Sequence, residues 1–235
     1  MVAFRRDPPH RGRPTPANWY ICTTVVVGTP NAGRPRGEAR REALLDAVLR
    51  VVAEVGVDAV THRRVADVAG LPLASTTYWF ESKEQMLTAA LERAADRDIE
   101  RLRAFVEESA THARDPLALA VSAILGPTEE LAEAPASGAA DNPTFTSRGW
   151  LLATYTLMLE AARRPELREV TTRWTDAYLE VLPPLLAAAG SRHPRSDAEI
   201  LLAATDGLLV DQLATGDASD LAPRLRRLAK ALVTG

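Results

Sequence analysis

The sequence has 235 residues, enough for one large or two modest domains, and 46% of them are hydrophobic, so the chain can bury a core. Aromatic residues are few and strand signals are scarce, while alanine, leucine, arginine and glutamate dominate, which favours helices throughout. No apolar run reaches the roughly 18 residues of a membrane span, so we expect a soluble protein. The single cysteine, Cys22, excludes a disulfide framework and a cysteine-based metal site and fits a reducing cytoplasm.

The net charge of −3 is unevenly distributed along the chain. Residues 1–41 contain eight arginines against Asp7 and Glu38, a net charge of +6, which leaves −9 on the remainder. A basic end on an acidic body suits an oriented approach to a polyanion. A basic tail with no partner would give the same distribution, so charge alone does not decide the function.

The first predicted element in chain order is a basic extension over residues 1–37 without helical periodicity. Its prolines, glycines and arginines predict disorder. The apolar stretch Trp19 to Val27 follows arginines, as in a signal peptide, but no small-residue cleavage pattern follows it. A later translation start, near Val25 to Val27, is an alternative explanation of this region.

A first helix is expected over residues 38–55. Apolar residues from Leu44 to Val55 recur at alternating spacings of four and three, which places them on one helical face. Gly56 follows at the position of a C′ glycine, where the chain leaves the helix.

Two short helices are expected next. Thr61 is a plausible N-cap for a helix over residues 62–69, and Gly70 closes it. Pro72 then opens a second short helix over residues 73–80. Two short helices joined at a Gly-Leu-Pro corner are the pattern of a helix-turn-helix.

Longer helices fill the remainder. Ser82 caps a helix that extends to about residue 111, with Gln85 at the capping-box position, and Asp115-Pro116 starts the next helix. Gly126-Pro127 interrupts that helix, and residues 133–143 form a loop. Further helices are expected at about 147–163, 166–189, 196–215 and 220–233. Pro183-Pro184 must kink or split the helix at 166–189.

The second short helix has the side chains that a major-groove helix needs. The side chains at its start are short, so the helix backbone could approach the base edges. Their hydroxyl and methyl groups could contact the bases. The expected base-facing residues are Leu73, Ala74, Ser75 and Thr77. Tyr78 and Trp79 could donate to phosphates and so position the helix.

Basic residues flank this helix. Arg63 and Arg64 open the helix before it and Lys83 opens the helix after it, at helix N-termini that attract phosphates. His62 could add charge when protonated. The core of the unit is expected to contain Val65, Ala66, Ala69, Leu71 and Phe80. Ordinary helical packing with serine and threonine caps would explain the same segment without DNA.

A family resemblance favours DNA. Three motifs carry it: Glu54-Val55-Gly56, then Thr61-x-x-x-Val65-Ala66-x-x-Ala69-Gly70-Leu71, then Tyr78-x-Phe80-x-Ser82-Lys83-Glu84-x-x-Leu87. Residues 38–98, about a quarter of the chain, resemble the N-terminal domain of the tetracycline-repressor (TetR) family of bacterial transcription factors. The resemblance implies an all-α homodimer in which three N-terminal helices bind DNA. It implies a long fourth helix and, over residues 99–235, a helical bundle that binds an inducer and dimerises.

The resemblance also assigns roles. His62, Arg63, Tyr78, Trp79 and Lys83 would hold phosphates, and Leu73, Ala74, Ser75 and Thr77 would face bases. Arg34 and Arg36, just before the first helix, could reach a minor groove as an arm. The sequence departs from the family's common residues at Pro72, Ala74, Thr77 and Trp79, where serine, glycine, tyrosine and histidine are frequent.

The C-terminal part contains no recognisable catalytic constellation, so we expect no enzyme. The four histidines share no ligand spacing, and no metal or cofactor is expected. Two sets of residues are candidates for other roles. Trp150, Tyr155, Met158, Trp174 and Tyr178 could line an apolar ligand pocket or be plain core. Asp206, Gly207, Asp211 and Gln212 could serve a ligand, but the resemblance places them at a dimer interface.

The expected function is therefore a cytoplasmic, homodimeric transcriptional repressor that binds a pseudo-palindromic double-stranded operator and is released by a small-molecule effector. A helical-bundle enzyme and a dimeric adaptor that does not bind DNA are the alternatives. Binding to the DNA upstream of its own gene would separate the three hypotheses.

Overall fold

The computed structural model describes residues 36–110, 115–125, 147–216 and 221–234, and within these ranges it contains helices and no strand. The all-α prediction is confirmed. The elements are α1 (Arg36–Val55), the 3₁₀ helix η1 (Val57–Ala59), α2 (His62–Ala69), α3 (Leu73–Trp79), α4 (Lys83–Ala110), α5 (Pro116–Leu125), α6 (Ser147–Glu160), α7 (Pro165–Ala188), α8 (Pro194–Thr215) and α9 (Leu221–Thr234). Residues 1–35 of the extension predicted over 1–37, and the loop at 133–143, lie outside the described residues. Arg36 and Gly37 are helical instead, because α1 begins at Arg36.

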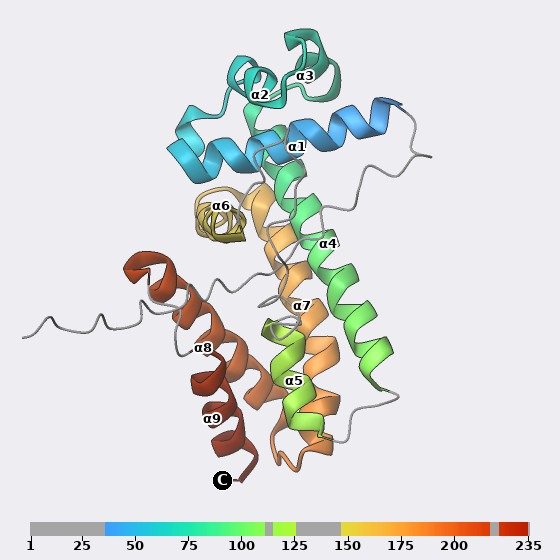
Figure 1. Ribbon diagram of the computed structural model, residues 1–235, viewed down its shortest axis with the longest axis vertical. Coiled ribbons are helices and arrows are strands. Elements are labelled where there is room, and N and C mark those ends of the chain that lie inside the picture. The colour runs from blue at the N-terminus through green and yellow to red at the C-terminus, as the bar shows by residue number, and fades with distance from the viewer. Residues whose placement is uncertain (1–35, 111–114, 126–146, 217–220, 235) are drawn as a thin grey trace, which may run out of the picture.

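The molecule is elongated, with α2 and α3 at one end and α9 at the other (Figure 1). α1 crosses beneath α2 and α3, and α4 runs from this end along the body with α7 beside it. α6 packs against α1, so an element from the C-terminal half directly contacts the N-terminal helices. The long helix α4 and the packed pair α1–α6 are the two connections between the ends.

Capping chemistry explains why the short helices begin and end where they do. The Thr61 hydroxyl accepts a hydrogen bond from the Arg64 amide at 3.2 Å, which confirms the predicted N-cap of α2. Gly70 ends α2 in the left-handed conformation, with φ 64°, as predicted. The Asp115 carboxylate accepts from the Leu117 and Ala118 amides at 3.0 Å, confirming it as the cap of α5.

One local prediction is confirmed in part, and another needs correction. Ser82 caps α4 as predicted, because its hydroxyl accepts from the Gln85 amide at 3.1 Å, whereas Gln85 Oε1 accepts from the Glu81 amide at 2.6 Å and not from the Ser82 amide. Of the kink or split predicted at Pro183-Pro184, the split does not occur, since α7 continues through both prolines, and the kink stays a prediction. Pro183 has no amide to donate to the Leu179 carbonyl one turn earlier. Arg195 Nη1 donates to that carbonyl at 3.4 Å instead, so a side chain from α8 satisfies an acceptor that the proline frees.

Two hydrophobic clusters form the interior. The first joins α1, α2 and the start of α4 to α6 and the first half of α7, with Leu45, Leu91, Leu157 and Leu167 fully buried. The second joins the end of α4 to α5, the end of α7, α8 and α9. The helix-turn-helix end thus shares its core with α6. Among the described residues no helix is long and apolar enough to cross a membrane.

Candidate nucleic-acid interface and effector cavity

The α2–α3 unit is held together by a small core and a buried hydroxyl. Val65 and Phe80 are almost fully buried, and Ala69 and Leu71 pack against the same cluster, as predicted. Thr76 is fully buried, and its hydroxyl lies 2.8 Å from the Leu73 carbonyl and 3.4 Å from the His62 carbonyl. Because one hydroxyl contacts the backbone of both helices, it helps to fix the angle between them.

The predicted base-facing residues lie on the outside of α3. Leu73 is 50% exposed, Ala74 and Thr77 are exposed, and Ser75 is half-buried. The Thr77 hydroxyl donates to the Ala74 carbonyl at 3.3 Å within the helix. Leu73, Ala74 and Thr77 are therefore accessible to a partner on the outer edge of α3.

The two aromatics at the end of α3 differ in their surroundings. Tyr78 is 78% exposed, whereas Trp79 is half-buried and packs against the first cluster. Their rings meet edge to face at 5.1 Å. Trp79 also lies near Gly37 at the start of α1, 3.7 Å from where a Cβ would be. Trp79 therefore has a packing role, and its phosphate contact stays a prediction.

Basic side chains flank α3 on both sides. Arg63 and Arg64 are exposed in the first turn of α2. Lys83, at the start of α4, is 26% exposed and lies 3.7 Å from the fully exposed Asp58 carboxylate. A pair of that length in water contributes little, so Lys83 can exchange it for a phosphate.

The remaining predicted DNA contacts are less clearly placed. His62 is half-buried, and its Nδ1 is buried without a hydrogen-bond partner among the described residues. Arg36 is the first residue of α1, so it begins the helix that it was expected to precede. Arg34 lies outside the described residues.

A cavity of about 110 Å³ lies in the C-terminal half between α4, α5, α6, α7 and α8. All five aromatic and methionine side chains proposed from the sequence line it: Trp150, Tyr155, Met158, Trp174 and Tyr178. The Trp150 and Trp174 rings meet edge to face at 6.1 Å. The structure therefore brings these residues together around one space, although their role as a ligand pocket stays a prediction.

A buried polar network borders the cavity. Asp98 Oδ2 accepts from Trp174 Nε1 at 2.8 Å and from the Tyr178 hydroxyl at 2.6 Å, and Asp98 Oδ1 accepts from Arg101 Nε at 2.9 Å. Burial, followed by the nearby Asp98 charge, raises the pKa of Tyr178 well above its usual value. Tyr178 is therefore a neutral donor at physiological pH.

The sequence reading missed Asp98. The residue lies on the apolar stripe of α4, four residues before Leu102 and seven after Leu91, both of which are fully buried. A carboxylate at a position that the helical periodicity expects to be apolar indicates a buried polar residue. In α4 the many other charged residues make this position of Asp98 hard to recognise from the sequence.

Four residues of α8 were assigned to a dimer interface. Gly207 and Asp211 are exposed, and a Cβ at Gly207 would meet nothing within 4 Å. Gln212 is half-buried, and its Oε1 is buried without a partner in the described part of the chain. Asp206 lines the cavity and accepts from the Tyr155 hydroxyl at 2.8 Å. The position of Asp206 in the cavity lining is therefore compatible with the alternative prediction, in which it contacts a ligand.

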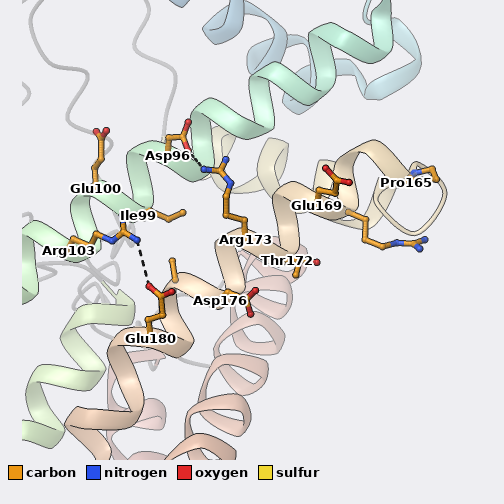
Figure 2. A pocket seen from close by; sticks show the side chains of 12 residues that line it. Asp96, Ile99, Glu100, Arg103, Pro165, Glu169, Thr172, Arg173, Asp176 and Glu180 are labelled. Atoms are coloured by element: carbon orange, nitrogen blue, oxygen red, sulfur yellow. Dashed lines mark hydrogen bonds and ion pairs between the residues drawn. The ribbon is translucent and has the colours of Figure 1, made fainter.

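A larger hollow of about 960 Å³ lies between α4 and α7, and its walls are mainly charged (Figure 2). Arg173 reaches Asp96, and Arg103 lies 3.7 Å from Glu180 across the hollow. These four side chains are at least half exposed, so the hollow is a solvated groove spanned by ion pairs. The smaller aromatic cavity is the better candidate for a small organic ligand. No group of metal-ligating side chains occurs among the described residues.

An N-terminal helix-turn-helix with an exposed outer edge on its second helix, joined by a long helix to a helical bundle, is the architecture of a class of DNA-binding transcriptional regulators. Comparisons with known proteins narrow this class. Residues 126–235 match the domain described as "Tetracyclin repressor-like, C-terminal domain".

Comparisons with individual relatives support the same family. The chain is 46% identical over 52 residues to the HTH-type transcriptional regulator BetI of Rhizobium meliloti, a match that spans 22% of this chain and only 26% of BetI. The structure of the multidrug binding protein EbrR with malachite green is 30% identical, with a TM-score of 0.58 over 83% of this chain and 98% of EbrR. A TetR-family member from Streptomyces coelicolor, SCO1917, is 28% identical, with a TM-score of 0.60 over 83% and 98% of the two chains. The chain belongs to the TetR family of transcriptional regulators.

Proposed function

We propose that the protein is a homodimeric repressor that binds a pseudo-palindromic operator and is released by a small-molecule effector, acting in the cytoplasm. The observation that carries this proposal is the outer edge of α3, where Leu73, Ala74 and Thr77 face solvent on a helix fixed to α2 from behind. In this assignment residues 38–98 form the DNA-binding domain and residues 99–235 the effector-binding and dimerisation domain.

The contacts on DNA divide by chemistry. Leu73, Ala74, Ser75 and Thr77 face base edges, where short side chains let the backbone approach. The remaining predicted residues contact phosphates and set the register without reading sequence: His62, Arg63, Arg64, Tyr78, Trp79 and Lys83.

Dimerisation is assigned to the outer face of α8. Ile200, Ala203, Gly207, Val210 and Ala214 recur at helical spacing, and all five are exposed. Ile200 and Val210 are 45% and 46% exposed, an unfavourable position for branched apolar side chains in water. Small residues between them allow a second helix to approach closely. Two copies paired here would present two α3 helices to successive half-sites.

The effector signal would pass through α6. Trp150, Tyr155 and Met158 on α6 line the cavity, and the same helix packs against α1. An effector that prefers a conformer with a shifted α6 would move α1 and the attached α2–α3 unit. It can lower DNA affinity only by the ratio of its affinities for the two conformers. Solved structures of the relative EbrR, which is 29–30% identical to this chain, hold imidazole, ethidium and malachite green, which supports an effector role for the bundle.

The test is a gel-shift titration of the full chain with DNA from upstream of its gene, at several salt concentrations. Lys83→Ala should weaken binding to all sequences and lower the salt slope by about one, because one phosphate contact is lost. Lys230→Ala is the matched control, since Lys230 is exposed on α9 at the opposite end of the molecule. A folded dimer that binds no palindromic DNA at low salt would contradict the proposal.

A further inference from the structure

The charges around the cavity are unbalanced. Among the described residues that line it, only two are charged, the aspartates Asp98 and Asp206. Asp98 is paired with Arg101 at 2.8 Å, so the first carboxylate is neutralised within the fold. No cationic side chain in the described residues pairs with Asp206. The lining therefore carries one uncompensated negative charge.

Asp206 is held in position but not neutralised. The Tyr155 hydroxyl donates to Oδ1 at 2.8 Å, and Oδ2 accepts no hydrogen bond from the described residues. Burial raises the pKa of Asp206 above its ordinary value, which means that its surroundings disfavour the charged form. Asp206 is nevertheless partly open to solvent, which places it at the mouth of the cavity. A ligand cation seated there would supply the missing counter-charge.

The walls suit the apolar body of such a cation. Trp150, Trp174, Tyr155 and Tyr178 all line the space. Aromatic faces attract cations through the ring quadrupole, and aromatic cages recognise quaternary ammonium groups in this way. The volume of about 110 Å³ is somewhat smaller than the cavity of about 150 Å³ that holds benzene in another protein, so the fitting ligand is compact.

We propose that this cavity selects a compact organic cation, with Asp206 as its counter-ion and the tryptophan and tyrosine rings as its walls. The inference rests on the proposed function, which makes this cavity the effector site. It adds that the effector is positively charged and that Asp206 recognises this charge.

Isothermal titration of the full chain with choline and with 3,3-dimethylbutan-1-ol tests the charge directly, because the two molecules share a shape and differ in charge. Sodium chloride keeps the ionic strength constant, and tetramethylammonium serves as a smaller cation. We expect the cations to bind on the order of tenfold or more tightly than the neutral alcohol. Asp206→Asn should abolish this preference, since asparagine keeps an acceptor for Tyr155 and removes the charge. Asp176→Asn, at an exposed carboxylate on α7 outside the cavity, should keep it.

Equal binding of choline and the alcohol, no binding of either cation at millimolar concentration, or an unchanged preference in Asp206→Asn would overturn the inference. Gel shifts on the same preparations separate it from the proposed function. DNA binding without cation selectivity defeats the effector class alone. Cation selectivity without DNA binding supports the cavity assignment and defeats the proposed regulation of DNA.

Discussion

The outer edge of α3, with Leu73, Ala74, Ser75 and Thr77, and the aromatic cavity differ in how their proposed contact residues take part in the packing of the fold. On α3 the proposed contact residues point outward, and a separate set of side chains, led by Val65, Thr76 and Phe80, holds the helix from behind. At the cavity the proposed contact residues are themselves part of the packing, and Trp174 and Tyr178 both donate to the buried Asp98. The first site separates binding from stability, whereas the second combines them.

This difference has a consequence for variation. Side chains on the outer edge of α3 should change at little cost in stability, so the proposed operator preference could change without loss of the fold. A change in the cavity lining alters the ligand site and the fold together. Variants at the two sites should therefore separate cleanly in stability measurements.

The largest expected effect contrasts Phe80 with Tyr78, two residues apart. Phe80→Ala should lower the free energy of unfolding by about 3–5 kcal/mol, because it removes a ring that is almost fully buried. Tyr78→Ala should cost under about 1 kcal/mol, the value of an exposed edge-to-face ring contact, and should weaken DNA binding. Urea denaturation together with gel shifts measures both. A large stability loss in Tyr78→Ala would remove the distinction between supporting and contacting residues on α3.

The second prediction concerns the ion pairs between α1 and α4, which connect the helix-turn-helix end of the molecule to its body. Arg93 on α4 is 7% exposed and pairs with Glu42 and Asp46 on α1. Arg93→Met should cost about 2–3 kcal/mol, because it leaves two partly buried carboxylates with one fewer cation, although Arg97 still contacts both.

Arg103→Met is the control for this prediction. Arg103 also lies on α4 and forms an ion pair with Glu180, but both side chains are largely exposed, so a cost under about 0.5 kcal/mol is expected. Equal costs in the two variants, measured by urea denaturation, would show that the α1–α4 pairs contribute no more than surface pairs.

The two regions also differ in how far the sequence predicts them. The α2–α3 unit occupies a continuous stretch, and its ends are set by short-range hydrogen bonds, so Thr61 and Gly70 could be identified from residue type and spacing alone. The cavity is assembled from residues 98 to 209 on five helices. The sequence supplied the five aromatic and methionine candidates, because large side chains at helical spacing stand out.

What the sequence could not supply were the pairings across helices. The contacts of Asp98 with Tyr178 and of Asp206 with Tyr155 join residues 80 and 51 positions apart. Such pairs depend on how α4, α7 and α8 pack, which local periodicity does not determine. The same reason applies near Pro183, where Arg195 on α8 donates to the Leu179 carbonyl that the proline leaves without an amide donor.

The third prediction compares two tyrosine hydroxyls at the cavity. Tyr178→Phe should cost about 1–2 kcal/mol in unfolding free energy, since the buried Asp98 loses a donor and Arg101 loses an acceptor. Tyr155→Phe should cost less, because its partner Asp206 is open to solvent and water can replace the hydroxyl. Thermal denaturation of both variants would measure this, and a reversed order would contradict the assignment of Asp98 to the buried network.

The smallest expected effect is a pH dependence at Asp206. Because burial raises its pKa in the folded state, the folded protein binds this proton more tightly than the unfolded chain does. Its favourable contribution is therefore complete below the unfolded pKa and is lost as the pH rises through the raised folded value. Asp206→Asn removes the titration and should match the wild type in acid, yet be more stable at neutral pH by under about 1 kcal/mol after solvent screening. Urea denaturation at pH 4 and pH 7, with Asp176→Asn on α7 as the control for loss of an exposed carboxylate, would measure the difference. A saturating organic cation should reverse the order at neutral pH, because it stabilises only the protein that retains the carboxylate.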